Sequence, residues 1–128
     1  MVNKSHIPLV NYHSHTYRCK HARGEVVEFV NAAAEAGLEI FGVSDHAALP
    51  DDRWPDVRMQ YEELDNYVEA VRSAQRSVPH VRVLLAMECE LVPEFKNYLQ
   101  DELLGKRQFD YLIAVSYTHL TLPTILLV

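Results

Sequence analysis

The sequence predicts an α/β fold built on a parallel sheet. Apolar runs with strand character alternate along the chain with segments of helical periodicity, and this pattern favours parallel strands in an open sheet or a barrel. The 128 residues are 48% apolar and 23% charged, with only four glycines, which is the composition of a globular protein. This length suffices for one ordinary domain and its core, but not for two.

The first half of the chain predicts two strands with a helix between them. Residues 7–12 form a short apolar run, and residues 38–43 form a second. Between them lies the segment 25–36, EVVEFVNAAAEA, which Gly37 is placed to end as a left-handed cap. The apolar residues of this segment recur at helical spacing: Val26, Phe29, Val30 and Ala33.

The second half continues the alternation. Residues 61–78 have an apolar face opposite a charged one, which predicts an amphipathic helix that Pro79 terminates. Residues 81–87, VRVLLAM, suit a strand that is buried on both faces. A third helix is predicted over residues 94–104, and a fourth strand begins over residues 111–115.

Charge and composition argue against several classes of partner. The net charge of -6 arises from 18 acidic and 12 basic residues, and the basic residues form no cluster that could follow a phosphate backbone. The chain has neither a signal-peptide pattern at its start nor an apolar run of membrane-spanning length. We therefore expect no nucleic acid and no membrane as partner, infer no specific protein partner, and predict a cytoplasmic protein. Cys19 and Cys89 are predicted to stay reduced there, with a disulfide between them as the alternative.

Candidate metal ligands follow three of the predicted strands. Because the carboxyl ends of parallel strands meet at one rim, we expect these side chains to converge. His13 and His15 are one residue apart, so on an extended chain both imidazoles project to the same side and can bind one ion. A carboxylate from a neighbouring strand can bridge two cations, and Glu88 is the candidate. The predicted ligands are His13, His15, His21, His46 and Glu88.

Neighbouring residues leave alternatives open. Asp45 either caps the following segment or orients a ligand histidine. Glu90 is predicted to be a solvated carboxylate, with a metal ligand as the alternative. Cys19 is predicted to be a buried thiol, with soft coordination of a metal as the alternative. Trp54, in the polar loop DDRWPD, either lines a substrate site at the same rim or packs against the protein.

Four motifs resemble those of the PHP superfamily, which is named for polymerase and histidinol phosphatase, and especially its histidinol-phosphatase branch. They are NYHSHTYRCKHARG, GLEIFGVSDHAALP, VLLAMECEL and FDYLIA. The resemblance spans residues 9–114 and implies the N-terminal part of a distorted seven-stranded (β/α) barrel, with about four parallel strands present. It also implies a centre of three divalent metals, either zinc, manganese or iron.

The resemblance assigns roles to individual residues. His13 and His15 would bind the first metal, His21 and His46 would contribute to the third, and Glu88 would bridge the first and second. Catalysis would depend on Glu88, His13 and His15 through a metal-activated water. Asn11 occupies a position where the family often has Asp; its amide can still accept a hydrogen bond but lacks the charge that would polarise a ligand histidine.

The implied activity is that of a metal-dependent phosphomonoesterase that converts L-histidinol phosphate to L-histidinol and phosphate in histidine biosynthesis. The partner would then be a small-molecule phosphate ester. One alternative is another PHP phosphoesterase, including the proofreading nuclease type, which the acidic balance disfavours. A second is a metal-binding fragment without activity.

The end of the chain departs from the family. Residues 115–128, VSYTHLTLPTILLV, resemble a translated transposon-end sequencing adapter. We therefore predict a partial PHP domain over residues 1–114 and a non-native tail over residues 115–128, which would leave the later family ligands absent. His119 lies near an expected ligand position but two residues late, and we interpret this as coincidence. Barrels of this general kind run to roughly 200 residues or more, which also predicts a fragment.

Overall fold

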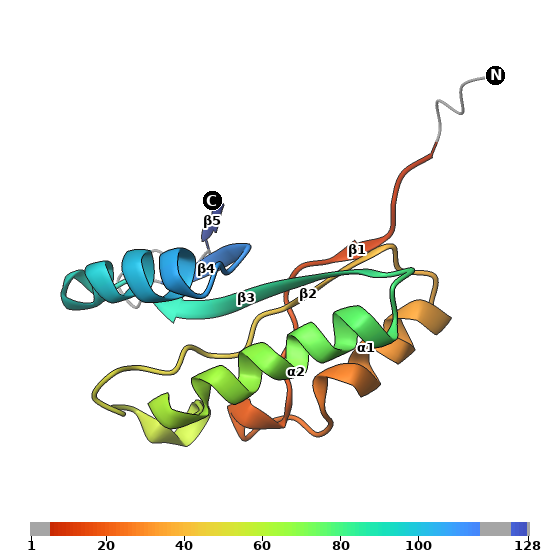
Figure 1. Ribbon diagram of the computed structural model, residues 1–128. Coiled ribbons are helices and arrows are strands. Elements are labelled where there is room, and N and C mark those ends of the chain that lie inside the picture. The colour runs from red at the N-terminus through yellow and green to blue at the C-terminus, as the bar shows by residue number, and fades with distance from the viewer. Residues whose placement is uncertain (1–5, 116–123, 128) are drawn as a thin grey trace.

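Four parallel strands form the body of the sheet in the computed structural model, which describes residues 6–115 and 124–127 (Figure 1). Neighbours in the chain are neighbours in the sheet, whose order is β1-β2-β3-β4-β5, and only β5 runs antiparallel, against β4. The predicted α/β class with about four parallel strands is confirmed. The strands are β1 (Val10–Asn11), β2 (Ile40–Val43), β3 (Arg82–Glu90), β4 (Tyr111–Val115) and β5 (Thr124–Leu127).

Two α-helices lie side by side along one face of the sheet (Figure 1). They are α1 (Val26–Glu35) and α2 (Leu64–Ser77). A π-helix, η5 (Tyr98–Lys106), connects β3 to β4. The short 3₁₀ segments are η1 (Tyr17–Cys19), η2 (Pro55–Val57), η3 (Tyr61–Glu63) and η4 (Pro93–Phe95). Within the described residues, no helix is both long enough and apolar enough to span a membrane.

Three predicted elements differ most from the observed ones. The first strand pairs over two residues only, Val10 and Asn11 with Ile40 and Phe41, and Ile7 and Leu9 before it are exposed. β3 extends beyond residue 87, since its last residues continue the ladder with β4 as far as Glu90 opposite Val115. The predicted helix over residues 94–104 is a 3₁₀ turn followed by η5, which runs past Gly105.

β3 divides its side chains between two environments. Leu85 and Met87 belong to the core between the sheet and the helices, whereas Ala86 belongs to a separate cluster with Tyr111 and Ile113 of β4. Successive strand residues point to opposite faces. The face that carries Ala86 therefore also carries Glu88, away from the helices.

A buried arginine anchors the start of α1. Arg18 donates to both carboxylate oxygens of Glu25, at 2.6 and 3.0 Å, and to Asn66 Oδ1 at 2.8 Å. Glu25 also caps the helix by a reciprocal capping box with Glu28. Burial raises the pKa of Glu25, but its hydrogen bonds to Arg18 and Val26 and the Arg18 charge outweigh burial and leave the pKa below its ordinary value.

Replacing Glu25 with Gln is expected to destabilise the fold by about 1 kcal/mol at neutral pH, a small effect because the Glu25 side chain is 38% exposed. The folded pKa is lower than the unfolded one, so the charge contributes stability that is complete above the unfolded pKa of about 4.3. That contribution is lost as the pH falls through the folded pKa. The difference in urea midpoint between Glu25→Gln and wild type should therefore shrink from about pH 5 downward.

The matched control is Glu69→Gln, because the Arg76–Glu69 pair is exposed on both sides. This variant should unfold like wild type at every pH. A Glu25→Gln effect that stays constant over the acidic range would show that the Glu25 charge plays no part in anchoring α1.

Candidate metal centre

Four predicted ligands meet where the first three strands end. His13 and His15 follow β1, His46 follows β2, and Glu88 lies near the end of β3. The Nε2 atoms of His13 and His15 are 3.1 Å apart, and His15 Nε2 lies 3.5 Å from Glu88 Oε1. His13 Nε2 contacts the same carboxylate oxygen. The other oxygen of Glu88 lies 3.2 Å from His46 Nδ1.

These separations suit a shared metal ion. Zinc–nitrogen bonds of about 2.0–2.1 Å place two ligand atoms about 3.3 Å apart on a tetrahedral ion. The separations of His15 Nε2 from His13 Nε2 and from Glu88 Oε1 are close to this value, whereas His13 and Glu88 are in direct contact and would have to move apart to share an ion. One donor atom of each of these residues lies within 4.8 Å of the others. In addition, His46 Nδ1 is buried without a hydrogen-bond partner in the described part of the chain. The residues therefore fit a metal bound between them.

Hydrogen bonds to the end of β2 fix the segment that carries His13 and His15. Asn11 Oδ1 accepts from the backbone N–H of His13 at 2.9 Å. Ser14, between the two histidines, donates its backbone N–H to Ser44 Oγ at 3.0 Å and its hydroxyl to the Gly42 carbonyl at 2.6 Å. The Ser44 N–H donates back to the Ser14 carbonyl at 2.9 Å. The segment thus continues beside β2 after the β1 ladder ends.

Asp45 lies beneath the histidines. Its carboxylate is fully buried and accepts from the backbone N–H of Thr16 at 2.7 Å and from the Thr16 hydroxyl. Its Oδ1 lies 3.7 Å from His15 Nδ1. Burial raises the pKa of Asp45, although the two bonds from Thr16 oppose this shift. Asp45 thus bonds to Thr16 rather than to His15, whose Nδ1 has no hydrogen-bond partner among the described residues; a short shift would bring Asp45 into the outer-sphere role that the sequence leaves open.

The charges in the cluster are those a cation prefers. Burial alone would raise the pKa of Glu88, but hydrogen bonding to His15 and the charges of His46 and His13 outweigh it and lower the pKa to about 2. Burial lowers the pKa of His46, and this effect outweighs the opposing charge of Glu88. Near neutral pH, Glu88 is therefore an anion beside a neutral His46 imidazole. Carboxylate and neutral imidazole are the forms that bind metals.

His21 does not join this cluster. Its side chain is exposed, and its backbone N–H donates to Cys19 Sγ at 3.3 Å. The chain reverses at Lys20, whose φ is 68°, and this turn separates His21 from the other histidines. Among the described residues, the second group with metal-binding spacing is instead His15, Cys19 and Asp45.

One neighbour differs from expectation. Glu90 is not solvated: its side chain is 2% exposed and forms an ion pair with Arg58, which the sequence analysis did not single out. Strand alternation from Glu88 could have placed Glu90 on the protected face, but no local pattern distinguishes a buried arginine from a surface one. Trp54 is 46% exposed. Both cysteines are buried and free, so the alternative of a disulfide is wrong.

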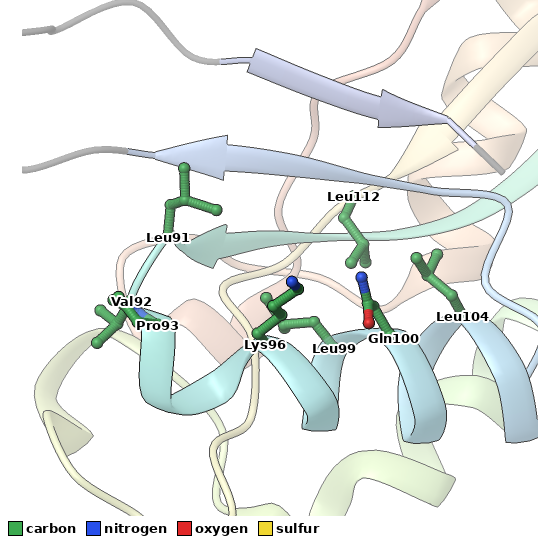
Figure 2. A pocket seen from close by; sticks show the side chains of 8 residues that line it. All are labelled: Leu91, Val92, Pro93, Lys96, Leu99, Gln100, Leu104 and Leu112. Carbon is green, nitrogen blue, oxygen red and sulfur yellow. The ribbon is translucent and has the colours of Figure 1, made fainter.

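An apolar groove lies elsewhere, between η5 and β4 (Figure 2). It has a volume of about 600 Å³, and Leu112 of β4 points toward the side chains of η5 across it. Its lining offers no histidine or carboxylate, so the groove is not a metal site. The lining residues are Leu91, Val92, Pro93, Lys96, Leu99, Gln100, Leu104 and Leu112.

Comparison with known proteins gives concordant results. The model of the PHP domain matches residues 11–122. A protein from Deinococcus radiodurans named "Probable histidinol-phosphatase" is 32% identical over 109 residues, which cover 83% of this chain and 41% of that protein. This chain thus spans less than half the length of that relative.

A solved structure shares the fold. It is that of a Listeria monocytogenes protein named as a candidate histidinol phosphatase, with a TM-score of 0.66 and 18% identity over 84% of this chain and 43% of that one. The curved parallel sheet thus corresponds to the N-terminal part of a PHP barrel. The match of the PHP-domain model to residues 11–122 establishes that the chain belongs to the PHP family, and its similarity to the Deinococcus protein points to the histidinol-phosphatase branch of that family.

Proposed function

We propose that the chain provides part of a metal-dependent phosphomonoesterase site, and that the intact protein hydrolyses L-histidinol phosphate to L-histidinol and phosphate in histidine biosynthesis. The observation that carries the proposal is the convergence of His13, His15 and Glu88 at the carboxyl edge of a PHP sheet. The name of the Deinococcus relative supports this substrate. The cytoplasmic location predicted from the sequence is part of the proposal.

His13, His15 and one oxygen of Glu88 would hold a first metal, and the other oxygen of Glu88, beside His46, would face a second. Bound zinc, manganese or iron would supply a Lewis acid for the phosphate oxygens and lower the pKa of the attacking water. The protein's own contribution is to orient the ligands: Asp45 faces His15, and Asn11 fixes the backbone of His13. His21 stays a proposed ligand of a third metal with His46.

The domain division stays a proposal as well. We propose that residues 1–114 are the partial PHP domain and that residues 115–128 are not native to it, on the basis of their resemblance to an adapter. Val115 nevertheless pairs with Glu90 as the last residue of β4, and β5 pairs with the outer edge of that strand. An open strand edge accepts other extended segments readily, so this pairing is compatible with either origin. His119 lies outside the described residues.

The substrate proposal predicts a strong preference for monoesters. A version of the chain extended by the missing part of the barrel should release phosphate from L-histidinol phosphate far faster than it cleaves the phosphodiesters of DNA, because the acidic net charge of -6 disfavours a polyanionic strand. Phosphate release from L-histidinol phosphate and the release of nucleotides from single-stranded DNA, each with and without a chelator, measure this. Comparable rates on single-stranded DNA would contradict the biosynthetic proposal and favour a nuclease. Metal binding without any phosphate release would favour a non-catalytic metal-binding protein.

A further inference from the structure

Arg58 is a buried cation next to the proposed metal centre, and all three of its guanidinium nitrogens donate hydrogen bonds. Nη1 donates to the Ala47 carbonyl and to Glu90 Oε2, both at 2.9 Å. Nη2 donates to Glu90 Oε1. Nε donates to the Trp54 carbonyl at 2.9 Å. The side chains of Arg58 and Glu90 are each 2% exposed, so water does not screen this pair.

Two of these partners lie one or two residues from proposed ligands in the sequence. Ala47 follows His46, and its N–H donates to the Glu88 carbonyl at 2.9 Å. The Glu88 N–H in turn donates to the Asp45 carbonyl at 2.9 Å, so that His46 and Glu88 form a parallel bridge. Glu90 lies two residues beyond Glu88, on the same face of β3. Arg58 therefore holds both sides of the bridge that joins the two ligands.

We propose that Arg58 is a positioning residue of the metal centre, which fixes His46 against Glu88 and couples that pair to the loop of Trp54. The inference rests on the proposed metal centre and adds a residue that touches neither metal nor substrate. A guanidinium presents a rigid, planar fork to a carboxylate, whereas an ammonium does not. The hydrogen bonds of Arg58 can thus fix both the distance between the Ala47 carbonyl and the Glu90 carboxylate and the orientation of one relative to the other.

Trp54 provides a direct reporter of this coupling. It is the only tryptophan of the chain, its carbonyl is bonded to Arg58, and its ring lies 5.7 Å from the Arg58 guanidinium carbon. The side chain is about half exposed and its backbone has a φ of 52°, a conformation that non-glycine residues adopt only where their surroundings hold them. A shift of Arg58 on metal binding should change the emission of Trp54.

The test compares zinc binding by wild type, Arg58→Lys, His46→Ala and the double variant, using competition with a chromophoric chelator. Arg58→Lys keeps the charge but loses the fork, and it should weaken zinc binding about 10-fold to 100-fold, as loss of outer-sphere partners does. In the His46→Ala background, Arg58→Lys should have no further effect, because the ligand that it positions is gone. Zinc should change Trp54 emission in wild type but not in Arg58→Lys.

Arg107→Lys is the matched control, since Arg107 also pairs with a carboxylate, that of Asp65, which lies in α2 rather than at the metal centre. It should leave both zinc affinity and the Trp54 response unchanged. If Arg58→Lys does not fold, Glu90→Gln removes the same ion pair and should give the same two effects.

Unchanged zinc affinity in folded Arg58→Lys would show that Arg58 only stabilises the end of β3. An equal loss in the presence and absence of His46 would also overturn the proposal. If wild type binds no zinc, the metal centre itself is wrong and this inference fails with it. If the zinc results hold but the extended protein releases no phosphate, only the proposed function fails.

Discussion

The double substitution His13→Ala, His15→Ala is expected to abolish stoichiometric metal binding. Only Glu88 would then remain of the three donors that lie within one ion's reach. A single carboxylate, bound in competition with water, holds a divalent ion weakly. Loss of an outer-sphere partner already costs about 10-fold to 100-fold in affinity, so loss of two direct ligands should exceed 100-fold. Metal content after dialysis, measured by elemental analysis, checks this.

The control removes two other imidazoles. His6 and His80 are exposed, and neither belongs to a group with metal-binding spacing among the described residues. The variant His6→Ala, His80→Ala should therefore keep its full metal content. Stoichiometric metal that persists after loss of His13 and His15 would place the metal site elsewhere in the protein and contradict the proposed centre.

Replacing Tyr67 with Ala is expected to destabilise the fold by about 3–5 kcal/mol, the range for losing a large buried aromatic ring. The side chain is fully buried in α2. Its hydroxyl lies 2.9 Å from the Val43 carbonyl, 2.7 Å from the Ala86 carbonyl and 3.4 Å from the Asp45 nitrogen. Burial raises the pKa of Tyr67 well above its ordinary value, so the hydroxyl keeps its proton and can donate. Tyr67→Ala therefore loses both packing and the bonds that link α2 to the end of β2 and to the middle of β3.

Urea unfolding measured by circular dichroism checks this value. Tyr67→Phe keeps the ring and should lose only about 1–3 kcal/mol, which isolates the contribution of the hydroxyl. Tyr17→Ala is the control, because the Tyr17 side chain is 46% exposed and its loss should cost little. A Tyr67→Ala midpoint equal to that of wild type would contradict the arrangement of α2 under the site.

Much of the candidate centre follows from local pattern alone. Strand ends can be identified from apolar runs, and parallel topology brings those ends to one edge. The sequence alone therefore suffices to group His13, His15, His46 and Glu88. The spacing of one residue between His13 and His15 is local information of the same kind. Grouping these four residues requires only that the order and direction of the strands are predicted correctly.

The remaining features depend on contacts that are distant in sequence. The burial of Glu90 depends on Arg58, 32 residues earlier, and no periodicity connects the two. His21 is exposed after a turn in which Lys20 adopts a left-handed backbone conformation. A glycine at this position would have suggested such a turn from the sequence, whereas a lysine does not. The π-helical form of η5 likewise has no signature in hydrophobic spacing, because helices of either type place Leu99 and Leu103 toward the core.

Side chains alternate between two faces along β3, so the number of residues before Glu88 decides which face each later side chain occupies. From Leu85 to Glu90, odd-numbered side chains face the helices and even-numbered ones face the centre. One residue inserted or deleted before Glu88 would exchange the two sets downstream of the change, turning a carboxylate into the apolar core and Cys89 toward the histidines. Two inserted residues would restore the alternation and only displace the ligand along the strand. Length changes in this strand should therefore be tolerated, if at all, in steps of two.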